Sequence, residues 1–166
     1  MLFILGGLPG SGKSTLALGL AQSRRALHLR IDTVEQAMRN AGQAVTGPEG
    51  YHVAGAIAAD NLKLGFDVIA DSVNPIEYTR AAWRQVAQDS GVSFLEIEIT
   101  CSDPAEHRRR VENRPADIPD LTLPTWQQVL DRQYEPWQGA LRIDTAGQGP
   151  QASVQCLEKA IAHALA

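Results

Sequence analysis

The fold of this chain is decided by the stretch Gly7-Leu8-Pro9-Gly10-Ser11-Gly12-Lys13-Ser14, which Thr15 follows directly. It matches the phosphate-binding loop (P-loop) pattern G-x-x-x-x-G-K-[ST] at every position. The apolar run 2–5 before it is typical of a buried strand, and the leucines and alanines after it have helical spacing. Glycines let backbone N–H groups converge on a phosphate chain, and the helix N-terminus adds partial positive charge. The stretch therefore predicts a nucleoside triphosphate site made by Gly10, Ser11, Gly12, Lys13, Ser14 and Thr15.

Two side chains of this loop have chemical roles in the pattern. Lys13 is expected to reach the β- and γ-phosphates, and the Ser14 hydroxyl is expected to bind Mg²⁺. The alternative is a glycine-rich turn before a helix that binds nothing. The complete match and the strand and helix on either side argue against that alternative.

Length, charge and cysteine content narrow the class of protein. The chain has 166 residues, a net charge of −4 and 44% hydrophobic residues, which predicts one domain over residues 1–166. The acidic balance argues against nucleic acid and anionic membranes as partners. Cys101 and Cys156 are too few for a disulfide framework, and no stretch has the length of a membrane span. A cytoplasmic protein, monomeric or homodimeric, is expected.

Strand and helix patterns alternate along the whole chain. Strands are expected at 2–5, 26–31, 66–71, 92–100 and 141–144, and helices at 13–24, 33–40, 49–64, 75–90, 103–114, 125–137 and 151–165. Three prolines and no periodicity mark 115–124 as a loop. This alternation predicts an α/β protein of three layers, with a five-stranded parallel sheet and helices on both faces.

Ligands of such sheets gather at the carboxyl ends of the strands, where this chain has Asp32, Asp71 and Asp144. Asp71 follows a mainly apolar strand, as does the carboxylate that holds Mg²⁺ in P-loop enzymes, so Ser14 and Asp71 form the predicted metal site. The alternative for Asp71 is a turn residue before Asn74 and Pro75. The four histidines have no spacing typical of a metal site.

Asp32 fits two hypotheses. With Glu35 it forms a capping box pattern, in which Asp32 is the helix N-cap and Glu35 the third helical residue. A carboxylate just beyond the second strand also faces the P-loop, where it can accept the proton of a hydroxyl that attacks the γ-phosphate. Both roles are compatible, and Asp32 is predicted to contact substrate as the catalytic base.

An arginine cluster, 108–110 with Arg114, lies beside the proline-rich loop. A guanidinium can stabilise the charge on a transferring phosphoryl group, which predicts a small lid over residues 108–124. Helical spacing places Arg110 and Arg114 on one face, so they are the predicted catalytic pair. The alternative is that these arginines point into water or pair with acids such as Glu106 and Asp117.

Taken together, the P-loop, Asp32, Asp71, Arg80, the Arg-Val-x-x-Arg pattern at 110–114 and the run Leu141-Arg142-Ile143-Asp144-Thr145 resemble the AAA-type predicted kinases. That group is similar to polynucleotide kinase, zeta toxin, chloramphenicol phosphotransferase, gluconate kinase and shikimate kinase. The resemblance implies ATP and Mg²⁺ as cofactors, and likeness to nucleoside-monophosphate kinases implies the strand order 2-3-1-4-5. It also implies an adenine-side loop that includes Thr145 and Gly147, and substrate contacts by Asp32, Glu35, Asn74 and Arg80.

Glu35 is the one departure from the group, since many members have arginine three residues after the base. An acid at this place would repel a phosphorylated acceptor and favour a neutral or cationic one. The leading hypothesis is an enzyme, a kinase that transfers the γ-phosphate of ATP to a hydroxyl of a small molecule. The alternatives are a regulatory or switch-like ATPase without such an acceptor and, disfavoured by Glu35 and the acidic balance, a nucleic-acid end kinase.

Overall fold

The computed structural model describes every residue from 1 to 166, and helices alternate with strands throughout. The strands are β1 Leu2–Gly6, β2 Leu27–Arg30, β3 Val68–Asp71, β4 Phe94–Thr100 and β5 Leu141–Asp144. The helices are α1 Lys13–Arg24, α2 Ile31–Asn40, α3 Glu49–Lys63, α4 Glu77–Asp89, α5 Pro104–Asn113, α6 Trp126–Leu130 and α7 Pro150–Ala164. Every predicted element is present, and most bounds agree within two residues.

The five strands form one parallel sheet in the order β2-β3-β1-β4-β5, which confirms the predicted topology. The register pairs Asp71 with Leu5 on one side and with Arg30 on the other. The ends of β2 and β3 and the start of the P-loop are therefore brought together at the carboxyl edge of the sheet.

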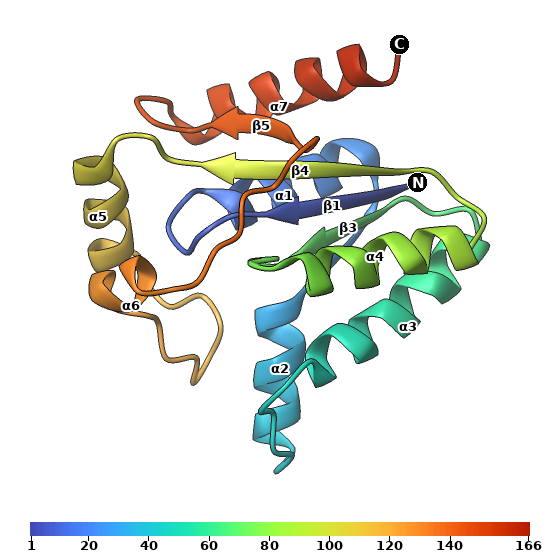
Figure 1. Cartoon of the computed structure of the whole chain (residues 1–166), viewed down its shortest axis with the longest axis horizontal. Helices are drawn as coiled ribbons and strands as arrows, with labels where there is room; N and C mark the ends of the chain where they lie inside the picture. Colours follow the sequence, from blue (N-terminus) through green and yellow to red (C-terminus); the bar gives the residue numbers. More distant parts are fainter.

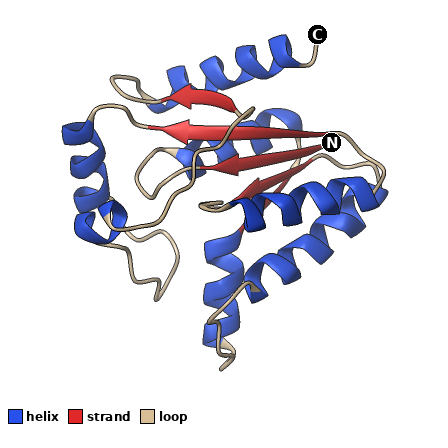
Figure 2. Cartoon of the chain, viewed as in Figure 1, coloured by secondary structure: helices blue, strands red, loops and turns tan.

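Each face of the sheet has its own apolar core because side chains alternate along every strand. On one face Phe3 and Leu5 of β1 pack with buried residues of α1 and α7. On the other face Leu2 and Ile4 pack against α3 and α4, and Trp83 fills the space between. Figures 1 and 2 show the resulting three layers, with helices on both sides of the strands.

The arginine-bearing part of the chain lies beyond the carboxyl ends of the strands. In Figure 1, α5 and α6 stand beside the arrowheads of the sheet, at the end where the P-loop also lies. Residues 114–125 between them contain no helix or strand, as the prolines predict. The lid predicted over 108–124 therefore consists of the second half of α5 and this loop.

The helix predicted over 125–137 is much shorter, and that prediction is wrong in extent. Thr125 caps α6 in a capping box with Gln128, but the helix ends at Leu130. The chain then runs over the sheet, where Trp137 is only 2% exposed. A Cβ on Gly6 would lie 2.2 Å from the Trp137 ring, so burial of this indole against β1 replaces the last helical turns.

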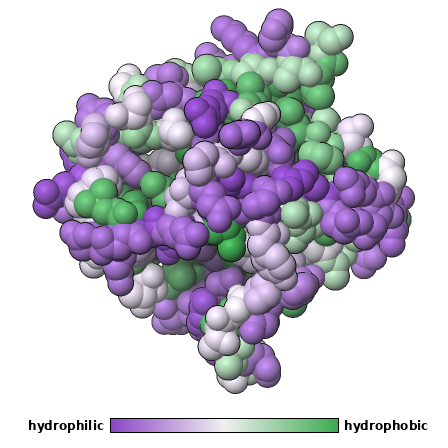
Figure 3. Space-filling model, viewed as in Figure 1, coloured by the Kyte–Doolittle hydropathy of each residue, from purple (hydrophilic) through white to green (hydrophobic).

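The face of the molecule in Figure 3 is mainly hydrophilic, with hydrophobic residues in scattered groups. None of the helices combines the length and the apolar character that crossing a membrane requires.

Candidate active site

The P-loop has the backbone of an anion-binding turn. Gly7, Gly10 and Gly12 have φ values of 148°, 86° and 92°, which side-chain-bearing residues rarely adopt. A Cβ on Gly7 would also lie 2.2 Å from the carbonyl oxygen of Ile99. Gly12 is the N-cap of α1, and no side chain caps this helix. The first-turn N–H groups of α1 thus have no partner in the helix and suit a phosphate group.

Lys13, the first residue of α1, forms a buried ion pair with Asp71. Its Nζ atom is also 3.5 Å from the Ser14 hydroxyl oxygen. The other carboxylate oxygen of Asp71 is 3.0 Å from His28 Nε2. Burial would raise the pKa of Asp71, but Lys13 and His28 outweigh that effect and hold this pKa well below its usual range. Asp71 is therefore an anion at neutral pH, and its side chain is fully buried beside Lys13.

A large cavity of about 1280 Å³ joins the P-loop to the start of α2 and to the lid. One end is walled by 8–10 and 12–16 of the P-loop and α1, and the other by polar residues of α2 that include Asp32 and Glu35. Arg110 and Arg114 lie in the wall between them. The structure thus gathers in one space the predicted phosphate loop, base, acceptor-side acid and lid arginines.

Asp32 also lies in the wall of this cavity, but it is not the helix N-cap that the sequence predicts. Helix α2 begins at Ile31, two residues earlier than a capping box at Asp32 requires, and its N-cap Arg30 makes no side-chain cap. The capping prediction is therefore wrong, because the helix begins directly where β2 ends. Asp32 is a first-turn residue of α2, and its half-buried carboxylate faces the cavity.

The two predicted lid arginines do not share a helix face. Helix α5 ends at Asn113, and Arg114 has the extended backbone of a residue that precedes proline (φ −70°, ψ 136°). Burial lowers the pKa of the Arg114 guanidinium, while the carboxylate of nearby Asp32 acts in the opposite direction. Arg114 lies on the Asp32 side of the cavity, and its Nε is buried without a hydrogen-bond partner.

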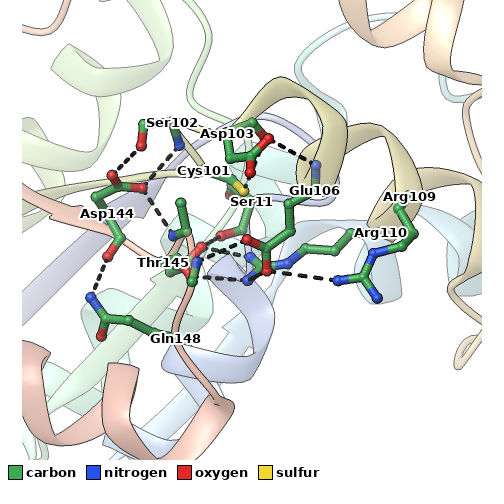
Figure 4. Close-up of polar contacts among 12 residues, drawn as sticks. Ser11, Cys101, Ser102, Asp103, Glu106, Arg109, Arg110, Asp144, Thr145 and Gln148 are labelled. Carbon is green, nitrogen blue, oxygen red and sulfur yellow. Dashed lines mark hydrogen bonds and ion pairs between the residues drawn. The ribbon is translucent and has the colours of Figure 1, made fainter.

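Arg110 points the other way, into a network on the side of β5 (Figure 4). Its guanidinium donates to the hydroxyl and carbonyl oxygens of Thr145, at 2.7 and 2.9 Å, and to Glu106 at 2.6 Å. The second oxygen of Glu106 accepts the Gly147 N–H at 2.8 Å. These two donors lower the pKa of Glu106. The predicted adenine-side residues Thr145 and Gly147 are thus hydrogen-bonded to side chains of α5.

Thr145 also connects this network to the P-loop. Its hydroxyl oxygen is 2.8 Å from the carbonyl oxygen of Ser11, and its Cγ2 atom is 3.4 Å from the position of a Cβ on Gly12. Neighbouring Asp144 accepts the Ser102 and Ala146 N–H groups, at 2.9 and 3.1 Å, and so fixes the turn after β5. Thr145 is buried and Gly147 exposed.

The loop 114–125 is bound by Arg30, the last residue of β2. Its guanidinium donates to both carboxylate oxygens of Asp117, at 2.5 and 3.1 Å. This bidentate pair bridges the cavity beside Asp32 and Arg114 and lowers the pKa of Asp117. The alternative hypothesis for the arginine cluster pairs Asp117 with one of the clustered arginines, whereas in the structure its partner is Arg30.

Asn74 and Arg80, the other two predicted substrate residues, do not reach the cavity. Asn74 is fully buried and donates from Nδ2 to the Leu5 carbonyl oxygen at 2.8 Å. Arg80 is 1% exposed and donates to the carbonyl oxygens of Asn74, Pro75, Glu135 and Pro136, at 2.7–3.3 Å. The Arg80 guanidinium and the Asn74 Nδ2 group donate to backbone carbonyl oxygens, so their geometry indicates a structural role.

Two histidines that the sequence did not mark as site residues contact the site. His28 binds Asp71, and the only signal for it is that His28 and Arg30 share one face of an alternating strand. His107 on α5 has its Nε2 atom 2.8 Å from the Pro9 carbonyl oxygen of the P-loop. Its ring also packs edge-on against Trp126. No local pattern marks His107, because its partners are distant in sequence.

The fold and this loop define a class, the P-loop nucleotide-binding proteins. The family described as an AAA domain matches residues 2–136, and the chain belongs to this family. The resemblance to AAA-type kinases predicted from the motifs is confirmed, since the similar structures include P-loop kinases.

The curated proteins to which this chain is similar are longer than the chain, and only part of each one matches it. The uncharacterised protein Rv2004c of Mycobacterium tuberculosis is 30% identical over 162 residues, which cover 88% of this chain and 32% of that protein. The chain therefore spans about one third of the length of the curated relatives it matches.

Three solved structures show the same fold. The APS kinase CysC of Mycobacterium tuberculosis, in complex with AMPPNP and APS, has a TM-score of 0.73 at 21% identity and covers 96% of each chain. A gluconokinase from Sinorhizobium meliloti has a TM-score of 0.66 at 17% identity and covers 97% of this chain and 91% of its own. Kti12 of Chaetomium thermophilum, in complex with ADP-AlF3, has a TM-score of 0.65 at 21% identity with complete coverage of both.

Proposed function

We propose that this protein is a kinase that transfers the γ-phosphate of ATP, in the presence of Mg²⁺, to a hydroxyl group of a small molecule. The single observation that carries the proposal is the shared cavity. It has a phosphate-binding loop at one end, a carboxylate on α2 at the other and an unpaired arginine between them. Membership of the AAA domain family and the fold of small-molecule kinases support it.

The residues of the P-loop suit ATP and Mg²⁺. The uncapped N-terminus of α1 and Lys13 offer donors to a phosphate chain. The adenine end is assigned to the turn with Thr145 and Gly147, and contact of the Thr145 hydroxyl with the Ser11 carbonyl oxygen supports this. The Ser14 hydroxyl and the Asp71 carboxylate are oxygen donors of the kind that Mg²⁺ prefers. When bound, the metal would neutralise charge on the phosphate oxygens.

Transfer needs a base for the acceptor and positive charge for the phosphoryl group. Asp32 takes the proton of the acceptor hydroxyl while the oxygen of that hydroxyl bonds to the γ-phosphorus. The bond from that phosphorus to the β,γ-bridging oxygen breaks, and ADP leaves. Arg114, half-buried beside Asp32, stabilises the charge on the transferring group. Arg110 contributes by holding α5 against the adenine-side turn.

Replacement of Asp32 tests this assignment. Asp32→Asn keeps the shape of the side chain and removes the base, so phosphate transfer should fall by about 100-fold or more, the usual contribution of a general base. Transfer to pooled small molecules would be followed by mass spectrometry, and nucleotide binding by calorimetry as the control. A variant that transfers phosphate at the wild-type rate would refute the base. Slow ATP hydrolysis that no pool stimulates would favour the switch-like ATPase instead.

A further inference from the structure

One face of α2 forms the acceptor end of the cavity. Asp32, Glu35, Gln36 and Arg39 follow one another at helical spacing, and all four line the cavity. Glu35 is held in place by α3, because a Cβ on Gly50 would lie 2.4 Å from its Cγ atom. A residue packed this closely against a neighbouring helix has a defined position, which recognition of a small molecule requires.

The charges on this face neutralise one another. Arg39 Nη2 donates to Glu35 Oε2 at 3.0 Å, and Arg30, the N-cap of α2, donates to both carboxylate oxygens of Asp117. Burial raises the pKa of Glu35 although Arg39 acts against it. Arg39 and Arg30 are therefore already paired with acids, and Arg114, which has no such partner, is assigned to the transferring phosphoryl group. An acceptor with a phosphate or carboxylate group would have to break one of these pairs, compete for Arg114 or lie against Glu35.

The hydrogen-bonding groups on this face come in adjacent pairs of donor and acceptor. The carboxylate of Glu35 accepts and the guanidinium of Arg39 donates, side by side on successive turns. Gln36 donates from Nε2 to Asn40 at 2.8 Å, which leaves its own carbonyl oxygen as a further acceptor. Neighbouring hydroxyl groups match such a surface, because each hydroxyl both donates and accepts.

The cavity also lacks a surface for stacking. None of its 32 lining residues is Phe, Trp, Tyr or His. Trp137 is buried against β1, and Trp126 packs against His107. Recognition of a base or another aromatic ring normally uses an aromatic side chain or a free guanidinium plane. The acceptor end has no aromatic side chain, and Arg114, which has no acidic partner there, is assigned to the transferring phosphoryl group.

We infer that the acceptor is an uncharged, non-aromatic polyol, a sugar or sugar alcohol. Neighbouring hydroxyls of the polyol bind the Glu35–Arg39 pair, while a further hydroxyl faces Asp32. This inference rests on the proposed function and narrows its substrate class. It assigns Glu35 and Arg39 to acceptor binding and leaves the nucleotide to the P-loop.

The experiment compares three pools of acceptors with the full chain, ATP and Mg²⁺. The first contains uncharged sugars and sugar alcohols, the second sugar acids and sugar phosphates, and the third nucleosides and other aromatic alcohols. Gain of one phosphoryl group by mass is the measurement. Transfer to members of the first pool alone is expected. Transfer mainly to the second or third pool would overturn the inference and leave the kinase function standing, whereas absence of transfer to all three would remove both.

Two variants then test the residues. Glu35→Gln and Arg39→Met each remove one charged partner of a hydroxyl, so the KM for the polyol should rise by about 10- to 100-fold. The KM for ATP and kcat should change less than about threefold, since neither residue touches the nucleotide or the reacting oxygen. Arg108→Met is the matched control, because Arg108 and Glu112 form the same i,i+4 pair outside the cavity. Equal effects of the control and the two variants would refute the assignment.

Discussion

Lys13 and Asp71 have a structural role in the protein as well as a predicted role with the nucleotide. Their side chains are 8% and 0% exposed, and each is the main countercharge of the other. Removal of one partner of a buried pair leaves an uncompensated charge, so Lys13→Met should lower the free energy of unfolding by about 3 kcal/mol. Asp71→Asn in the same chain should recover part of the loss. Urea denaturation of both single variants and the double variant measures this coupling, and strictly additive losses would contradict it.

The same carboxylate predicts a pH dependence of stability. The pKa of Asp71 is lower in the folded protein than in an unfolded chain, where it is about 3.9. Its contribution is therefore fully present above the unfolded pKa and is lost as the pH falls toward the folded pKa. Between about pH 6 and pH 3 the wild type should lose more stability than Asp71→Asn. Equal slopes in urea denaturation at a series of pH values would show that the pKa of Asp71 is the same in the folded and the unfolded protein.

At the scale of elements, α5 is tied to the turn after β5 by two side chains. Arg110 donates twice to Thr145, and Glu106 accepts the Gly147 N–H. Loss of the guanidinium in Arg110→Ala should raise hydrogen exchange in both α5 and 145–149, even without nucleotide, because the two segments lose their shared partner. Arg108→Ala is the control, because Arg108 lies on the same helix and pairs only with Glu112. Faster exchange in α5 alone would show that the turn does not depend on the helix.

The elements themselves follow from the sequence more closely than the contacts between them. Apolar runs and glycine or proline stops place all five strands, since period and turn chemistry are local properties. The wrong predictions depend on long-range packing. The cap at Asp32 fails because α2 continues directly from β2, and the 125–137 helix is cut short by burial of Trp137. Thr145, to which Arg110 donates twice, lies 35 residues away, so no helical spacing could identify it.

At the scale of the whole molecule, Arg80 joins the last third of the chain to its middle. Its guanidinium lies 4.6 Å from the centre of the Trp137 ring and 5.4 Å from that of Tyr134. It also donates to carbonyl oxygens on both sides, in 74–75 and in 135–136. The segment 131–140, which crosses the face of β1, is thus held against α4 through one buried side chain.

Arg80→Met separates this structural role from the substrate role that the resemblance implies. The change removes the donors of four carbonyl groups, so the free energy of unfolding should fall by at least about 3 kcal/mol. Arg84→Met, one turn further along α4, removes partly exposed ion pairs to Glu77 and Glu96 and should cost about 1 kcal/mol. Under conditions where both variants stay folded, their KM for the acceptor should equal that of the wild type. If Arg80→Met instead has the stability of the wild type and loses affinity for the acceptor, Arg80 contacts substrate. In that case burial of Trp137 alone holds the segment 131–140 against β1.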